Sequence, residues 1–203
     1  KAWLLFGDDD FGAMWKVSIE AANRYLTDER ETGLWYGHAD MATGTRSDTR
    51  FGALGCFLPA VLALGGDVER AETLMDSCFR MWTAFGIEPE QLEYVTLAPL
   101  NTKYYLRPEV IESAYYLYRL TGKDRYREMG RAMFESIVEH CRTEAGFAEL
   151  EDVVSKRKAD RMESFFLAET LKYAYLLFAP PATLAFDSVI FNTEAHPFRR
   201  TWE

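Results

Sequence analysis

Three glycines, each ending one helical pattern and preceding another, constrain the fold of this chain more than any other feature. They are Gly7, Gly66 and Gly122; each stands two residues after a leucine, and charged residues follow, in a weaker form at Gly66. A glycine in this place commonly ends a helix in the left-handed conformation. The glycines are 59 and 56 residues apart, a period that predicts repeated αα-hairpins. Because the intervening loops are long, we expect an all-α fold, a closed αα-hairpin toroid rather than an open solenoid.

The pattern of apolar residues places the individual elements. It predicts a helix through about Leu26 and further helices over residues 50–64, 67–85, 108–121, 124–141 and 161–178. Pro59 is expected to kink the helix over residues 50–64. Residues 27–49 and 86–105 are expected to form long loops, the first with room for a hairpin. Residues 146–158 are typical of a small β-hairpin, and residues 189–193 are typical of a C-terminal strand.

The acidic excess restricts the possible partners. The chain has 203 residues, a net charge of −9 and a hydrophobic fraction of 48%. Nucleic acid and anionic membrane surfaces attract basic proteins, so neither is an expected partner. A neutral or cationic ligand fits better, with a divalent metal ion as the obvious candidate. The length allows one large domain or two small ones, and we take residues 1–203 as a single, partial domain.

The helix that begins near Pro108 carries the first candidate site residues. Proline suits the first helical position because its missing N–H has no partner there. Glu109 and Glu112 then lie in the first turn on neighbouring faces, and Arg107 stands just outside the helix. Acids in a first turn are also favoured by the helix dipole alone, so this stretch by itself has an ordinary structural explanation.

Two later segments make a functional site the better interpretation. Met162, Phe166, Glu169, Tyr173 and Leu176 form one helical stripe that is apolar except for the glutamate. A carboxylate on such a stripe costs several kcal/mol unless it is paired, bound to metal or hydrogen bonded. An ion pair with a lysine or arginine is the alternative explanation.

The second segment is VIFNTEAHPF, which contains Thr193 and Glu194. The hydroxyl and carbonyl oxygens of one threonine can both bind a hard cation such as Ca²⁺. An ordinary edge strand with no bound metal is the alternative explanation of this segment. The histidines show no zinc-binding spacing with cysteine or aspartate, and the chain contains neither a nucleophile elbow nor a Gly-rich phosphate loop.

Three segments, LRPEVIES, DRMESFFLAETLKYAYLLF and IFNTEAHPF, resemble signature segments of the class I α-1,2-mannosidases, glycoside hydrolase family 47. The resemblance covers essentially the whole chain. It implies an (αα)7 barrel whose pocket is plugged by a β-hairpin, and it implies that this chain is the C-terminal half of that barrel. It also implies an inverting, Ca²⁺-dependent hydrolysis of α-1,2-linked mannose from high-mannose N-glycans.

The resemblance assigns roles to individual residues. Glu109 matches the general base, and Thr193 matches the residue that binds Ca²⁺ directly while waters complete the shell. A water-rich Ca²⁺ needs many nearby acceptors and few direct ligands, which agrees with the number of acids here. The residues that match groups holding the sugar or its waters are Arg107, Phe165, Glu112, Glu169, Glu194 and Glu90.

The chain also departs from the family pattern. The family's general acid and a further essential aspartate lie upstream of the position that Lys1 matches. The resemblance therefore implies a missing partner, the N-terminal half of the same domain, and an inactive chain in isolation. Some members have a histidine three residues before Cys56, where this chain has Ala53, so the preferred mannose stays open.

Two other functions remain as alternatives at this point. A non-catalytic factor of the same fold could bind glycans in endoplasmic-reticulum degradation, although every catalytic carboxylate expected in this chain is present. Within the family, the DRMESFF segment is more similar to the degradation-enhancing branch. The cysteine pair and FNTEAHP lean toward the processing branch. A plain helical scaffold is the third possibility, and acids that point to one centre would argue against it.

The cysteines predict an oxidising compartment. Cys56 lies ten residues before Gly66 and Cys78 twelve residues after it. If Gly66 is the tip of an αα-hairpin, both lie roughly 15–18 Å from the turn and nearly opposite each other. We therefore predict a Cys56–Cys78 disulfide, which the resemblance supports, with Cys141 free. Such a bridge implies the secretory pathway or secretion.

Overall fold

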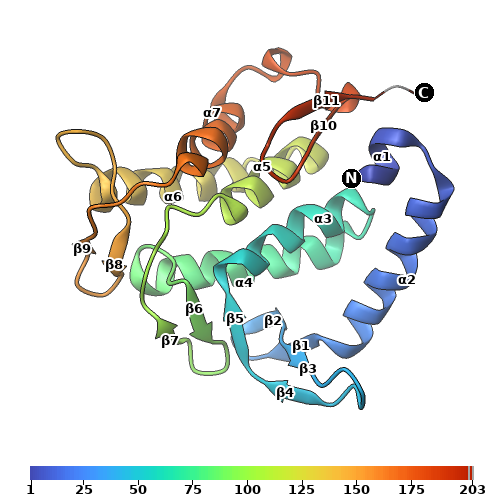
Figure 1. Ribbon diagram of the computed structural model, residues 1–203, viewed down its shortest axis with the longest axis horizontal. Coiled ribbons are helices and arrows are strands. Elements are labelled where there is room, and N and C mark those ends of the chain that lie inside the picture. Colours follow the sequence, from blue (N-terminus) through green and yellow to red (C-terminus); the bar gives the residue numbers. More distant parts are fainter. Residues whose placement is uncertain (201, 203) are drawn as a thin grey trace.

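The helices are joined in pairs at the glycines. The computed structural model describes residues 1–200 and 202. Gly7, Gly66 and Gly122 have φ of 70°, 95° and 70°, so each adopts the left-handed conformation that glycine accommodates without strain. The helix pairs are α1 (Ala2–Phe6) with α2 (Asp9–Tyr25), α3 (Leu58–Leu64) with α4 (Val68–Phe85), and α5 (Glu109–Thr121) with α6 (Arg125–Cys141), followed by α7 (Leu171–Phe178). The repeated αα-hairpins predicted from the glycine spacing are therefore present (Figure 1).

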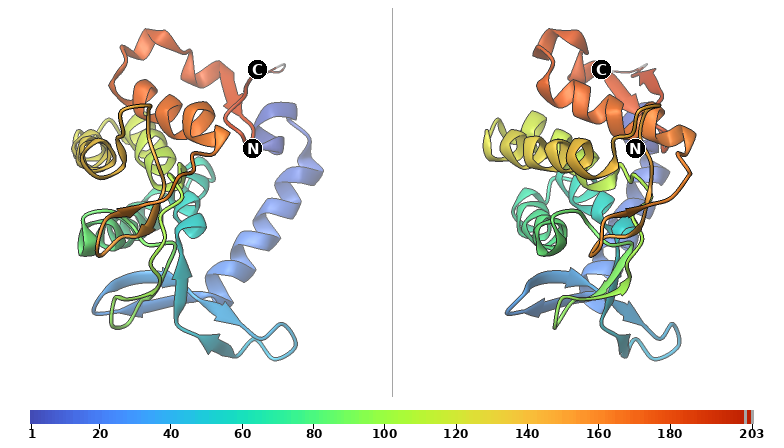
Figure 2. Two further views of the ribbon diagram at one scale, coloured as in Figure 1. Left: turned by 60° about the vertical axis from the view of Figure 1, so that its left-hand side comes forward. Right: turned by 90° about the vertical axis from the view of Figure 1, so that its left-hand side faces the viewer.

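Helix α5 is the centre of the packing. It contacts α3 and α4 on one side and α6 and α7 on the other, as both views of Figure 2 show. Its Val110, Ile111, Ala114 and Leu117 side chains are completely buried. Ser113 fastens α5 to the start of α3: its hydroxyl donates to the Cys56 carbonyl at 2.6 Å and accepts from the Ala60 N–H at 3.2 Å. The first turn of α5 is thereby held rigidly in the middle of the fold.

Short antiparallel strands fill the loops between the helix pairs. Figure 1 shows β1 to β7 gathered below α3 and α4 in the lower part of the view, whereas β10 and β11 lie beside α1 near the N-terminus. The paired strands are β1 (Thr27–Arg30) with β2 (Gly33–Tyr36), β3 (His38–Ala39) with β4 (Arg46–Asp48), β5 (Arg50–Gly52) with β6 (Gln91–Glu93) and β7 (Ala98–Asn101), β8 (Leu150–Asp152) with β9 (Arg157–Lys158), and β10 (Val189–Phe191) with β11 (Pro197–Arg199). The hairpin predicted within residues 146–158 is present as β8 and β9.

The predicted helix over residues 50–64 is wrong in its first half. Arg50–Gly52 is strand β5, Ala53–Phe57 is a 3₁₀-helix, and α3 begins only at Leu58. Pairing of β5 with β6 outweighs the local helical pattern because it buries Phe51 against the Trp35 ring, with ring centroids 5.2 Å apart. Pro59 consequently lies in the first turn of α3, where its missing N–H costs nothing, and the predicted kink does not occur.

Other predicted element boundaries also differ from those in the structure. Residues 86–105 contain the β6–β7 hairpin instead of a structureless loop, and the strand predicted at residues 189–193 is one arm of the β10–β11 hairpin. The helix predicted from residue 161 begins at Ser164, and Phe166–Thr170 is a wide π-helical turn before α7. Pro108 caps α5 at the residue before its first turn, one position from the prediction.

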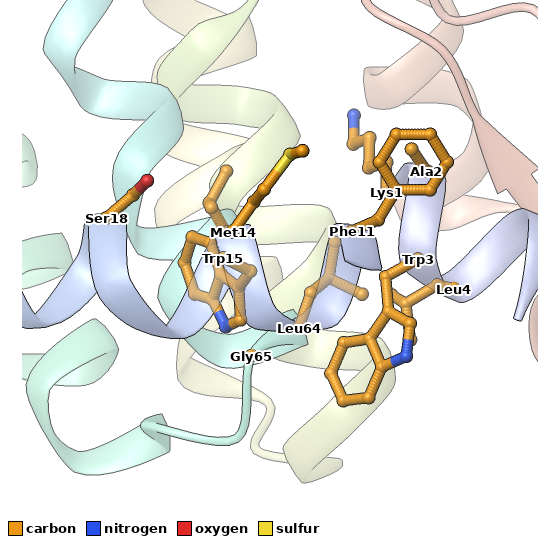
Figure 3. Close-up of a pocket in the computed structure, with 11 residues that line it drawn as sticks. Lys1, Ala2, Trp3, Leu4, Phe11, Met14, Trp15, Ser18, Leu64 and Gly65 are labelled. Atoms are coloured by element: carbon orange, nitrogen blue, oxygen red, sulfur yellow. The ribbon is translucent and has the colours of Figure 1, made fainter. Parts of the chain in front are cut away.

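Helices α2 and α3 approach closely because residue 65 has no side chain. A Cβ atom at Gly65 would lie 2.5 Å from the Trp15 indole, which Figure 3 shows beside Leu64 and Gly65. The indole, Phe11 and Met14 line an apolar hollow of about 260 Å³. Over residues 1–200 and 202, no helix has the length and apolarity required to cross a membrane.

Candidate active site

An acidic hollow of about 400 Å³ opens at the N-terminal end of α5. Glu109 and Glu112 enter it from the first turn of α5, Glu169 from the π-helical turn before α7, and Thr193 from the β10–β11 hairpin. The rest of the lining is Lys1, Leu54, Phe57, Val61 and Pro108. The structure thus brings together four residues that the sequence predicted from three separate segments. Carboxylates opposite an apolar wall can bind a sugar, which offers hydroxyls on its edge and C–H groups on its face.

Glu112 is the most firmly held acid of the hollow. It is only 8% exposed, and its Oε1 atom accepts a hydrogen bond from the Tyr173 hydroxyl at 3.0 Å. The Lys1 ammonium forms an ion pair with the same oxygen at 2.9 Å. Tyr173 was predicted on the same helical stripe as Glu169, and the structure shows that it orients an acid on the neighbouring helix instead.

Glu109 has the protonation behaviour that a general base requires. Burial raises the pKa of Glu109 to about 7, with smaller contributions from Glu112 and Glu169 in the same direction. Its own backbone N–H and the Arg107 guanidinium oppose this rise by favouring the ionised form. A base is most effective when its pKa lies near the working pH, because it is then ionised often enough yet still binds a proton well.

Glu169 is half-buried, less enclosed than its place on an apolar stripe predicted. Burial raises the pKa of Glu169, and the carboxylates of Glu112 and Glu194 add to the rise, while Lys172 and Lys1 oppose it. Acids gathered in this way repel one another, so a cation among them would be favoured.

Arg107 forms a second group of site residues beside Glu109. Its guanidinium makes two hydrogen bonds to Glu90, Nη2 to Oε1 at 2.7 Å and Nε to Oε2 at 3.1 Å. The guanidinium carbon lies 5.9 Å from the centre of the Phe165 ring. Phe166 is fully buried against Phe147, with ring centroids 4.9 Å apart, whereas Phe165 is only half-buried. Of the two adjacent rings, Phe165 is therefore the one that can contact a ligand.

Strained backbone flanks the site on both sides. Leu106, before Arg107, has φ of 60°, and Ala195, after Glu194, has φ of 55°. The Thr170 hydroxyl holds the Leu106 carbonyl at 2.7 Å, and the Lys172 ammonium holds the Ala195 carbonyl at 2.8 Å. Strain of this kind persists where the surrounding structure over-determines it, and it is common at functional sites. One segment, residues 170–172, therefore fixes both flanks.

Thr193 occupies the tip of a tight turn. The Asn192 side-chain oxygen accepts hydrogen bonds from the N–H groups of Glu194 at 3.0 Å and His196 at 2.8 Å, which closes the β10–β11 hairpin. Thr193 and Glu194 are both exposed. Glu194 does not line the hollow, although its charge reaches Glu169. The turn therefore presents the threonine, and not the neighbouring acid, to the carboxylates of α5.

Cys56 and Cys78 are buried thiols that lie side by side. Burial raises the pKa of Cys56, and the adjacent Cys78 thiol raises it further. Both thiols are free in the structure, and their proximity is one condition for a disulfide, which stays a prediction.

We expect the complete protein, isolated without reductant, to contain a Cys56–Cys78 bridge and a free Cys141 thiol. Cleaving the bridge should lower the free energy of unfolding by about 3 kcal/mol, since it closes a loop of intermediate length. Peptide mapping by mass spectrometry under non-reducing conditions checks the pairing. Alkylation of both Cys56 and Cys78 without prior reduction would show that the pairing is wrong.

The sequence interpretation missed Glu88, which is completely buried beside this site. The available signal was the motif GIEPE, in which Glu88 stands two residues before Glu90. Only Glu90 was assigned a role, because nothing in the local pattern indicates that the first glutamate points inward.

Comparisons with known proteins place this geometry in context. The profile described as "Glycosyl hydrolase family 47" matches residues 1–200. The chain is 37% identical to human mannosyl-oligosaccharide 1,2-alpha-mannosidase IC, over 97% of this chain and 34% of that protein. It is 40% identical to mouse ER degradation-enhancing alpha-mannosidase-like protein 2, over 80% of this chain and 32% of that protein. The chain thus spans about a third of the length of these relatives.

A solved structure supports the same relationship. The alpha-1,2-mannosidase from Trichoderma reesei superposes with a TM-score of 0.77 at 27% identity, over 92% of this chain and 46% of that chain. This match confirms the fold class predicted from the sequence, a portion of an (αα)7 barrel.

Proposed function

This chain belongs to glycosyl hydrolase family 47, and from that premise we propose that the complete protein hydrolyses α-1,2-linked mannose from high-mannose N-glycans with inversion. Membership confirms the family resemblance on which the sequence interpretation rested. The observation that carries the proposal is the convergence of Glu109, Glu112, Glu169 and Thr193 on one hollow. The relatives named mannosidases support it by analogy of fold and sequence.

Glu109 acts as the general base in this proposal. Its carboxylate takes a proton from a water molecule while the water oxygen bonds to the anomeric carbon and the glycosidic C–O bond breaks. The departing oxygen takes its proton from a carboxylic acid that the family resemblance places upstream of Lys1. An inverting enzyme separates its two carboxyl groups by about 6.5–9.5 Å to leave room for the water, so the acid belongs across the hollow from α5.

The residues of the hollow fit a Ca²⁺ ion. Their donors are oxygens, which hard cations prefer. Burial and, to a smaller extent, the neighbouring carboxylates raise the pKa of Glu109 and of Glu169, and positive charge in the hollow would oppose this rise. Within the described part of the chain, no three Asp, Glu, His or Cys side chains are close enough to cage an ion. Thr193 would hold the ion, with Glu112 and Glu169 accepting from its waters. A bound Ca²⁺ would supply charge that fixes water and sugar hydroxyls in place.

The remaining candidates bind and orient the sugar. The Arg107 guanidinium, held by Glu90, donates to ring hydroxyls, and Phe165 offers the accessible part of its half-buried ring to the apolar face of mannose. Glu194, at the edge of the turn, completes the set of acceptors. Binding and chemistry are thereby divided between two neighbouring groups, Arg107 with Phe165 and the acids of α5.

A non-catalytic glycan-binding factor is the second candidate. It is favoured by relatives named ER degradation-enhancing proteins. Both candidates place the protein in the secretory pathway and give it high-mannose glycoproteins as substrates or ligands. They differ in whether mannose is released.

We expect the complete protein to release free mannose from an α-1,2-linked mannobiose and from a high-mannose glycan when Ca²⁺ is supplied. Quantifying free mannose, with glycan binding measured in parallel by calorimetry, separates the two candidates. Binding with no release over many hours would favour the glycan-binding factor. Neither binding nor release would contradict both.

A further inference from the structure

Glu88 is a completely buried acid that the proposed reaction does not use. It lies between Ile87 and Pro89 in the segment that joins α4 to β6, and its exposed fraction is 0%. Neither carboxyl oxygen has a hydrogen-bond partner among the residues that the structure describes. Burying a carboxyl group in this way is costly, and most of all if it is ionised. Its surroundings therefore decide its protonation state.

Several titratable and charged groups lie near Glu88. The titratable and charged groups facing it are Glu90 on its own segment, Glu109 at the start of α5, Cys78 on α4, Cys56 on the 3₁₀-helix, Tyr104, and Arg107. Burial raises the pKa of Glu88 well above its usual range, and the acids and the Cys78 thiol act in the same direction. Arg107 opposes them, but its Nε and Nη2 atoms are occupied by Glu90. These influences favour the protonated form of Glu88, which has one O–H to donate.

Two further polar atoms near Glu88 are enclosed and unpaired. They are the Tyr104 hydroxyl and the Oε2 atom of Glu109, neither of which has a partner within residues 1–200 and 202. The Tyr104 ring is fixed edge-on against Trp82 with centroids 5.7 Å apart, and burial raises the pKa of Tyr104 well above its usual range, so that its hydroxyl keeps its proton. Folded proteins leave few buried polar atoms unpaired, and buried water commonly joins those that face one another. The three side chains thus form one polar cluster behind the hollow.

We propose that Glu88 is a positioning residue for Glu109: its carboxyl O–H, together with the Tyr104 hydroxyl, hydrogen bonds through buried water to the inner oxygen of Glu109 and fixes that carboxylate from behind. This inference rests on the proposed function of Glu109 as base. A carboxylate whose Oε2 is anchored presents its other oxygen to the hollow in one orientation. Orientation matters because misplacing a reacting group by about 1 Å can lower a rate by about 10²-fold.

The test compares Glu88→Gln with Glu88→Leu in the complete protein. The amide of Gln is neutral and can still donate, so Glu88→Gln should keep kcat within about 3-fold, whereas Glu88→Leu cannot donate and should lower kcat by about 10–100-fold. KM should change little in both, because Glu88 does not touch the sugar. Tyr104→Phe removes the other donor and should lower kcat by a smaller factor. The unfolding temperature of each variant is measured in parallel, so that kcat is compared under conditions in which all of them are folded.

Infrared difference spectra provide a readout that does not depend on activity. At a pH well above the Glu109 pKa of about 7, the C=O band of a protonated carboxyl should be present in the unmodified protein and absent from Glu88→Gln. No difference in this band would show that Glu88 is ionised and would overturn the proposal. A Leu variant with unchanged kcat, or a Gln variant as impaired as the Leu variant, would overturn it as well.

The same experiment separates this inference from the proposed function. Unmodified protein that binds glycan but releases no mannose would refute the role of Glu109 as base, and with it the positioning role of Glu88. Unmodified protein that is active, with Glu88→Leu equally active, would refute the positioning role alone.

Discussion

Glu109→Gln in the complete protein should lower kcat by about 10²–10⁴-fold, the usual contribution of general acid–base catalysis. The amide has the size of the carboxyl group, so the hollow keeps its shape, but it cannot take a proton from water. KM should change far less, because Arg107 and Phe165 hold the sugar from the neighbouring group. Steady-state kinetics on an α-1,2-linked mannobiose checks both values. A variant with raised KM and unchanged kcat would make Glu109 a binding group.

The pH dependence of the same variant supplies an independent check. The ionised form of Glu109 is the active one, so kcat/KM should fall as pH drops below the Glu109 pKa, which is about 7 before any cation lowers it. The variant should lose this acid limb. Glu151→Gln, at an exposed position on strand β8, is a matched control that should keep both the rate and the limb.

As pH rises, the free energy of unfolding should fall while activity rises. The folded-state pKa of Glu109, about 7, exceeds its ordinary value of 4.5, so folding takes up a proton between these values. The free energy of unfolding therefore falls as pH rises from about 4.5 to 7, by up to about 3 kcal/mol without bound cation. Glu109→Gln should remove this loss and unfold at a higher temperature at pH 8. A higher unfolding temperature would also show that the lower kcat of Glu109→Gln is not caused by unfolding of the variant.

Local rules of sequence were sufficient for the first turn of α5. Pro108 and the apolar spacing determine where the helix begins, and the helical period then puts Glu109 and Glu112 on adjacent faces. The glycine spacing was equally informative, because a left-handed residue at a helix end is a local requirement. These features depend on residues within a few positions of each other, which is why the sequence predicts them.

Features that depend on distant contacts could not be predicted in the same way. Strand β5 exists because residues 50–52 pair with residues 91–93, and that pairing overrides a helical pattern. Phe165 and Phe166 are adjacent residues of the same type, and the packing of Phe147 against Phe166 determines which of the two rings is buried. Glu88 looks like any acid in a polar turn until α4, α5 and Tyr104 enclose it. Some residues of the site can thus be predicted from local sequence patterns, whereas others depend on how distant segments pack around them.

Removing Ca²⁺ from the complete protein with a chelator should abolish mannose release, and adding Ca²⁺ should restore it. The reason is electrostatic: without a cation, burial and the neighbouring carboxylates raise the pKa of Glu109 and of Glu169, and water and sugar are left unoriented. Unchanged activity in chelator would contradict the metal proposal while leaving the fold and the family untouched.

Thr193→Val is the sharper form of this test, because it replaces the hydroxyl by a methyl group and keeps the backbone carbonyl at the tip of the turn. Loss of one oxygen ligand should weaken Ca²⁺ binding by about 10–100-fold, the range found when metal sites lose a supporting group. Thr193→Ser keeps the hydroxyl and should bind nearly as the unmodified protein does. Thermal unfolding gives a readout separate from activity. Ca²⁺ at about 100 times its dissociation constant stabilises the folded state by about 2.7 kcal/mol, and at the same concentration Thr193→Val should keep only about 0.4–1.4 kcal/mol of that increment. If Val and Ser variants respond alike to Ca²⁺, the ion is held by the carbonyl and the acids of α5, and the hydroxyl of Thr193 has no part in binding it.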